Sequence, residues 1–176
     1  CVVILGCSTP PQPMPEPIVS PFAQQAAGAT WRLFHTSDEH GWMEGERKNG
    51  VQFGGIAMLR RHLAQVDFVA DRDLLVSGGD MWTGPALSTL LQGKPMVELF
   101  NLSGYIASAL GNHEFDFGRK VLAEHIASSR FAYLAANVVD ANGKRPAGVL
   151  GHLLLERGGR RIGLIGLANR ATPLVT

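Results

Sequence analysis

The sequence is short of cysteine. It has two, Cys1 and Cys7, and both lie within the first seven of its 176 residues. Beyond Cys7, the chain therefore has neither a disulfide framework nor a thiolate that could hold zinc. Any metal bound by this part of the chain must be held by oxygen and nitrogen ligands.

A strong charge of either sign is also missing, as is a long apolar run. The formal net charge of +1 gives no electrostatic argument for a nucleic-acid partner, and we expect none. The apolar run at residues 1–7 is too short to span a membrane. The length and the 45% hydrophobic content are typical of a soluble globular α/β protein with one core, or of part of a larger one.

The first 30 residues differ in composition from the rest. Residues 1–7 (CVVILGC) look like the end of a signal peptide, and Ile4–Cys7 resembles the bacterial lipobox, whose cysteine is lipidated. Residues 8–30 hold six of the ten prolines, which favours an extended linker. We expect an exported periplasmic or cell-envelope lipoprotein, attached to the membrane only through Cys7. The alternatives are an ordinary secretory signal and a buried strand with a free thiol.

From Trp31 onward, strand and helix patterns alternate, which indicates an α/β fold. Parallel strands joined by crossover helices are the expected arrangement. The expected strands are 31–36, 74–77, 106–110 and 131–137. One expected helix begins at Ile56, and two others cover 96–101 and 121–129. We expect 148–155 and 161–167 to form a β-hairpin.

Polar residues follow three of the expected strands. Asp38 and His40 follow the first strand, Asp80 the second, and Asn112 with His113 the third. Ligands of open α/β sheets gather beyond the carboxyl ends of the strands, so we expect these loops to converge at one sheet edge. Asp38 and His40 are two residues apart and point to the same side of an extended chain, where they can clamp a first-row metal.

Each of these residues also has an ordinary structural interpretation. Asp-x-His alone is a common loop sequence, Asp80 suits a helix cap or a turn, and Asn112 suits an Asx-turn. The two oxygens of Asp80 can also bridge two cations. His113 is either a satisfied loop histidine or an acid–base group kept basic by Asp116.

As an ordered set, these motifs resemble those of the calcineurin-like metallophosphoesterases. Three blocks are similar to those of the 5′-nucleotidase branch: His35–Gly41 (HTSDEHG), Gly78–Gly84 (GGDMWTG) and Gly111–Gly118 (GNHEFDFG). Ala135–Val138 and Ile162–Leu167 fit its later strands. The resemblance covers 31–176 and implies the N-terminal part of a catalytic domain. The implied fold is a four-layer α/β/β/α sandwich, incomplete at the C-terminus.

The resemblance implies a dinuclear site that holds two divalent ions (Zn, Mn, Fe, Mg or Ca). Asp38 and His40 would hold the first ion, Asp80 would bridge the two, and Asn112 would bind the second. The implied reaction is hydrolysis of a small phosphate ester, in the first place a nucleotide, with metal-bound water as nucleophile.

The same resemblance places His113, supported by Asp116, beside the leaving group or a phosphate oxygen. We expect Glu114 to fix its loop through hydrogen bonds. Trp82 and Thr83 are expected to line the pocket or to pack. The remaining histidines receive structural roles: His35 in packing, His152 in the hairpin, and His62 and His125 at a surface or interface.

Some parts of the family pattern do not occur in these 176 residues. Relatives complete their metal sites with later histidines, one alone and one in Gly-His-x-His, and the nucleotidase branch adds a nucleoside-binding domain. We therefore expect a fragment that is inactive alone. The substrate remains open between 5′-nucleotides, 2′,3′-cyclic nucleotides and thiosulfonates. A catalytically dead, lipid-anchored binding protein is the alternative to an enzyme.

Overall fold

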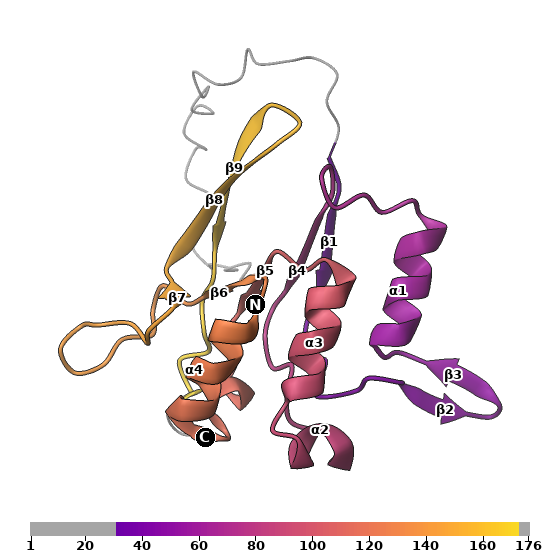
Figure 1. Ribbon diagram of the computed structural model, residues 1–176, viewed down its shortest axis with the longest axis horizontal. Coiled ribbons are helices and arrows are strands. Elements are labelled where there is room, and N and C mark those ends of the chain that lie inside the picture. The colour runs from indigo at the N-terminus through magenta and orange to yellow at the C-terminus, as the bar shows by residue number, and fades with distance from the viewer. Residues whose placement is uncertain (1–30, 173–176) are drawn as a thin grey trace, which may run out of the picture.

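The computed structural model describes residues 31–172 (Figure 1). The predicted signal-peptide end, the lipidation site Cys7 and the Pro-rich linker lie outside these residues. Within the described part, no helix is long and apolar enough to cross a membrane.

A five-stranded parallel sheet forms the centre of the fold. Its strand order is β1-β4-β5-β6-β7, and every neighbouring pair is parallel. The strands are β1 (Leu33–Thr36), β4 (Leu74–Ser77), β5 (Ala107–Ala109), β6 (Ala132–Leu134) and β7 (Val149–Leu150). The connections contain the helices α1 (Ile56–Gln65), α3 (Lys94–Ser103) and α4 (Gly118–Ser128). The α/β class and the four main strands are thus confirmed.

The remaining elements are short. β8 (His152–Arg157) and β9 (Arg160–Ile165) form the expected antiparallel hairpin, which contacts β6, whereas β7 joins the parallel sheet. The hairpin of β2 (Glu46–Lys48) and β3 (Val51–Phe53), the helix α2 (Ala86–Leu90) and the 3₁₀ turn η1 (His113–Phe115) were not predicted. β2 and β3 are exposed along their whole length, so no apolar alternation marks them.

α3 shows how local sequence sets the length of a helix. Pro95 lies in the first turn, where its missing N–H costs nothing. Gly104 ends the helix with a φ of 83°, a left-handed conformation that glycine adopts without steric cost. The helix is therefore longer at both ends than the expected 96–101.

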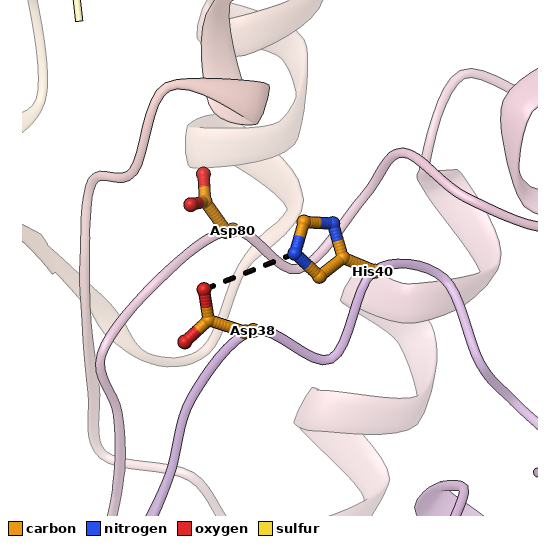
Figure 2. Close-up of side chains that lie close together, drawn as sticks. All are labelled: Asp38, His40 and Asp80. Atoms are coloured by element: carbon orange, nitrogen blue, oxygen red, sulfur yellow. Dashed lines mark ion pairs between the residues drawn. The ribbon is translucent and has the colours of Figure 1, made fainter. Parts of the chain in front are cut away.

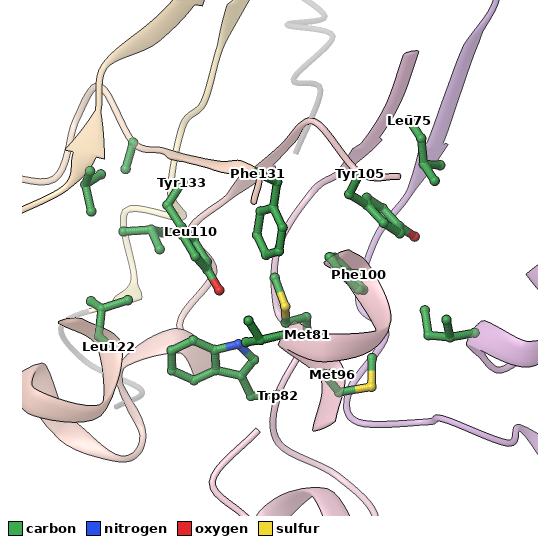
Figure 3. Packing of buried hydrophobic residues seen from close by; sticks show 14 of the residues in the cluster. Leu75, Met81, Trp82, Met96, Phe100, Tyr105, Leu110, Leu122, Phe131 and Tyr133 are labelled. Carbon is green, nitrogen blue, oxygen red and sulfur yellow. The ribbon is translucent and has the colours of Figure 1, made fainter. Parts of the chain in front are cut away.

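The helices and the sheet share one hydrophobic core (Figure 3). Phe100 of α3 stacks on Tyr105 with ring centroids 3.8 Å apart and also contacts Phe131. Met81 and Trp82 are fully buried in the same cluster. Burying side chains of this size stabilises a fold by about 1.5–3 kcal/mol each. Because Asp80 directly precedes these two residues, the core holds the loop that carries it.

The sheet face away from this core is only partly covered. Leu33, His35, Val76 and Leu134 line a hollow of about 170 Å³ there, together with the end of β9. The helices, the sheet and this hairpin agree with part of a four-layer sandwich. His35 is exposed among the described residues, so the predicted packing role is wrong for this part of the chain.

An ion cluster joins the starts of β1 and β4. Asp73 is fully buried, and its carboxylate accepts hydrogen bonds from Arg32 at 2.6 Å, Arg72 at 2.9 Å and the Val69 N–H at 2.9 Å. Both arginines hold the pKa of Asp73 well below its usual range. The cluster fixes β1 beside β4 at the end of the strands opposite to Asp38 and Asp80.

We predict that Asp73→Asn lowers the free energy of unfolding by about 2 kcal/mol, because an amide group then faces two guanidinium groups. The arginines are partly exposed, which keeps the loss below that of a fully buried ion pair. Asp71→Asn is the control, since Asp71 is exposed and should change stability by less than about 0.5 kcal/mol. Urea denaturation measures the free energy of unfolding of both variants. Equal losses in the two would contradict the stabilising role assigned to Asp73.

Candidate metal centre

The loops after β1 and β4 run side by side. The N–H of Asp38 donates to the Gly79 carbonyl at 3.0 Å, and the N–H of His40 donates to the Asp80 carbonyl at 2.9 Å. One residue further along, Gly41 donates to Met81 at 2.8 Å. This ladder brings Asp38 and His40 next to Asp80, as expected for loops that follow parallel strands of one sheet.

The third loop, after β5, reaches the same place. The backbone N–H of His113 donates to Oδ1 of Asp80 at 2.9 Å. The approach depends on glycine, because a Cβ at Gly111 would lie 2.1 Å from that oxygen, and one at Gly79 would lie 2.6 Å from the Gly111 nitrogen. The predicted convergence of three loops on one sheet edge is therefore confirmed.

Asp38, His40 and Asp80 form a candidate metal site (Figure 2). One ligand atom from each of the three lies within 4.8 Å of the others. Nε2 of His40 is 3.8 Å from Oδ1 of Asp38, and in the part of the chain that the structure describes no lysine or arginine forms an ion pair with either aspartate. Two carboxylates and an imidazole without a cationic partner are a donor set that suits a divalent first-row metal.

The backbone of this cluster is strained. Asp38, His40 and Asp80 have φ angles of 56°, 44° and 59°, in the left-handed region that non-glycine residues rarely adopt. Such conformations cost free energy and concentrate at functional sites, where neighbouring contacts enforce them. Here the ladder between the two loops supplies those contacts.

Asn112, the fourth predicted ligand, is half-buried at the start of η1. Its backbone carbonyl accepts the Phe115 N–H at 3.0 Å, and no described residue hydrogen-bonds its side-chain amide. The hydrogen bond from His113 to Asp80 holds this residue at the edge of the cluster.

His113 and Asp116 form the predicted pair. Nδ1 of His113 lies 2.7 Å from Oδ2 of Asp116, and the two side chains are 28% and 20% exposed. The His113 ring also packs edge-to-face on that of His40, with centroids 4.9 Å apart. The pair therefore directly adjoins the candidate metal site.

Glu114 is fully buried and connects two of the loops. Its carboxylate accepts the N–H of Asp80 at 3.0 Å, of Met81 at 2.8 Å and of Gly111 at 2.6 Å. Burial raises the pKa of Glu114 to about 7, against the effect of these three donors. The expectation that Glu114 fixes its loop is confirmed, and it fixes the Asp80 loop as well.

Sequence reasoning missed one other group at this edge, Glu39, and gave Thr83 only a pocket-lining or packing role. Glu39, between Asp38 and His40, accepts the Ser77 hydroxyl at 3.0 Å, and burial raises its pKa to about 7. Thr83 contacts both His40 and Asp116. The position of Glu39 within the first motif was the available signal, whereas the sequence alone does not show the contacts of Thr83.

The two histidines expected at a surface or interface differ in burial. His125 is buried at the interface of α4 with Gln92 and Trp82, with Nε2 2.7 Å from the Gln92 carbonyl and its ring edge-on to Trp82. Its spacing on α4 does not show that the Trp82 loop covers it. His62 is exposed on α1, as expected.

The two buried glutamates predict how stability depends on pH. Their pKa values rise from about 4.5 to about 7 on folding, so the folded state binds more protons between these values. Without divalent metal, the free energy of unfolding should therefore fall as the pH rises from about 4.5 to 7, by up to about 3 kcal/mol for each glutamate. Asp73, whose pKa is lowered, stays ionised in this window.

Urea denaturation at several pH values measures this slope. Glu114→Gln should reduce it, because an amide does not titrate, while Glu46→Gln at an exposed position should leave it unchanged. An unaltered slope in Glu114→Gln would show that Glu114 is ionised throughout.

Comparison with known proteins finds relatives that resemble this chain in sequence. The chain is 32% identical to the 5′-nucleotidase of Vibrio cholerae over 98% of its own length and 30% of that protein. It is 30% identical to the 5′-nucleotidase of Rattus norvegicus over 84% of its length and 28% of that protein. The chain thus spans less than a third of either relative.

A solved structure shares the fold. The 5′-nucleotidase precursor of Thermus thermophilus superposes with a TM-score of 0.72 at 31% identity, over 80% of this chain and 29% of that one. The family profile for calcineurin-like phosphoesterases matches residues 32–172. This match contains all three converging loops. The chain therefore belongs to the calcineurin-like phosphoesterase family, and its relatives lie in the 5′-nucleotidase branch.

Proposed function

We propose that the protein hydrolyses phosphate esters with the help of divalent metal, and that 5′-nucleotides are its principal substrates. The observation that carries the proposal is the convergence of Asp38, His40 and Asp80 within 4.8 Å, beside the His113–Asp116 pair. The 5′-nucleotidase relatives support the choice of nucleotide.

In this proposal, the four candidate ligands divide between two divalent ions. Asp38 and His40 would hold one ion, Asn112 would hold the other, and Asp80 would contact both. His40 fits this role because its Nδ1 is 3.2 Å from the Thr83 carbonyl, which leaves Nε2 free toward the carboxylates. When bound, such ions supply a Lewis acid that activates water and neutralises charge on the phosphate.

His113 provides the proton chemistry. Because Asp116 accepts a hydrogen bond from Nδ1, the imidazole presents Nε2 to a bound ester. With protons on both ring nitrogens, a state that the Asp116 carboxylate favours, the imidazole donates its Nε2–H to a phosphate oxygen or gives that proton to the leaving alkoxide. The neighbouring His40 ring limits rotation of His113, which keeps Nε2 in place.

We also propose that the protein is exported and that a lipid on Cys7 tethers it to the cell envelope through the Pro-rich segment 8–30. The support is the lipobox-like sequence Ile4–Cys7 and the proline content of the segment that follows. An extended tether would let the catalytic domain reach small soluble esters.

The test is phosphate release by the protein expressed with its complete reading frame. We expect turnover of nucleoside monophosphates that chelation abolishes and added Mn²⁺ or Zn²⁺ restores. His113→Ala should lower kcat by about 10²–10⁴-fold while bound metal is retained. Asp80→Asn should lose both metal and activity. His152→Ala, which removes an exposed imidazole on β8, is the control.

The panel should also contain 2′,3′-cyclic nucleotides and thiosulfonates, since the same scaffold suits other esters. Preference for one of these would replace the nucleotide assignment. A protein that binds nucleotide but shows no turnover, with no effect of His113→Ala, would instead be a binding protein.

We further predict that residues 31–176 alone have no appreciable phosphatase activity. In the described part of the chain, Asp38, His40 and Asp80 form the ligand cluster at this edge, and Asn112 would add one amide oxygen. Two divalent ions need more donors than these. Phosphate release by the purified segment, measured with excess Mn²⁺, tests this. Robust metal-dependent turnover would contradict it.

A further inference from the structure

Thr83 contacts two different parts of the candidate site. Its hydroxyl donates to Oδ2 of Asp116 at 2.5 Å, and its backbone carbonyl lies 3.2 Å from Nδ1 of His40. One residue thus joins the metal-binding imidazole to the carboxylate that orients His113. The sequence alone suggested only a pocket-lining or packing role for it.

The carbonyl contact determines how His40 presents its ring. A carbonyl oxygen only accepts, so Nδ1 of His40 carries the proton. Nε2 then has a free lone pair and lies on the side of Asp38, 3.8 Å from Oδ1. This contact is made by the backbone carbonyl, so a substitution at position 83 keeps it as long as the loop is not distorted.

The hydroxyl contact depends on the side chain. Oδ2 of Asp116 accepts both the Thr83 hydroxyl and Nδ1 of His113, at 2.5 Å and 2.7 Å. Two donors on one oxygen fix the carboxylate between them, and hydrogen bonds to a charged acceptor are among the stronger ones in proteins. Without the hydroxyl, the Asp116 side chain loses the contact that ties it to the Asp80 loop.

Thr83 is itself held firmly. Trp82 is fully buried, and its carbonyl accepts the Ser88 hydroxyl at 2.7 Å. On the other side, Gly84 donates to the Thr89 hydroxyl at 3.3 Å. Position 84 must be glycine, because a Cβ there would lie 1.8 Å from the His40 carbonyl oxygen. The anchored loop gives Thr83 a fixed position from which to act.

We propose that Thr83 is a positioning residue that sets the orientation of His113 through Asp116, while its backbone aligns His40 for the metal. The inference rests on the proposed function, since it assigns a supporting role in that same reaction. It requires that the hydroxyl affect the proton chemistry and leave metal binding unchanged.

The experiment compares Thr83→Val, which keeps the shape and removes the hydroxyl, with Thr83→Ser, which keeps the hydroxyl. In the protein expressed with its complete reading frame, Thr83→Val should lower kcat for a nucleoside monophosphate about tenfold at unchanged KM. Thr83→Ser should restore most of this loss. Metal content should be the same in both variants, because the contact to His40 is made by the backbone.

Two further measurements separate positioning from a general structural effect. The loss in Thr83→Val should be smaller with p-nitrophenyl phosphate, whose leaving group needs less help from His113. In an Asp116→Asn background, Thr83→Val should cause no additional loss, because the two residues act as one unit. Equal loss with both substrates, or additive losses, would overturn the proposal.

A measurement that does not depend on catalysis tests the role of Thr83 separately from the proposed function. In the NMR spectrum, the Nδ1 proton of His113 should be protected in the wild type and in Thr83→Ser and should exchange faster in Thr83→Val. If the wild type showed no turnover, the proposed function would fail, and this signal would still decide the role of Thr83. An unchanged signal in Thr83→Val would overturn that role.

Discussion

The candidate site depends on one buried carboxylate, that of Glu114. It lies at the meeting point of the loops after β4 and β5 and accepts three backbone N–H groups, two from Asp80 and Met81 and one from Gly111. Buried donors without partners would each cost about 1–3 kcal/mol. The two loops can therefore turn sharply inside the protein, because a single side chain accepts hydrogen bonds from their buried N–H groups. Asp80 and His113 reach each other as a consequence.

The same junction requires glycine and strained backbone. Gly79 and Gly111 lie so close to neighbouring backbone that a Cβ on either would collide with it or with Asp80. Asp38, His40 and Asp80 adopt left-handed conformations beside them. The fold offsets this cost with the buried side chains of Met81 and Trp82, which anchor the loop in the core. The Arg32–Asp73 cluster fixes the other end of the same two strands.

Much of this could be predicted from the sequence, for identifiable reasons. The apolar run Leu74–Ser77 is buried except at the half-buried Val76, and such a run predicts a strand. The residues after such a strand lie at the carboxyl edge of a parallel sheet. From the sequence alone, this rule selects Asp38, His40, Asp80, Asn112 and His113. It failed where elements are short and exposed, as in β2 and β3, because nothing apolar marks them. Whether His125 lies at a surface or at an interface also stayed open, because helical spacing does not show which loop covers a residue.

The sequence by itself determined the class of fold, the three polar motifs and the absence of thiolate ligands beyond Cys7. These follow from residue type and local spacing, which are properties of short segments. Only the tertiary structure decided which atoms meet: Glu114 with the N–H groups of another loop, and Thr83 with both His40 and Asp116. Such contacts join residues more than 30 positions apart. Their geometry is set by how the strands align and how the core holds each loop, which no local pattern encodes.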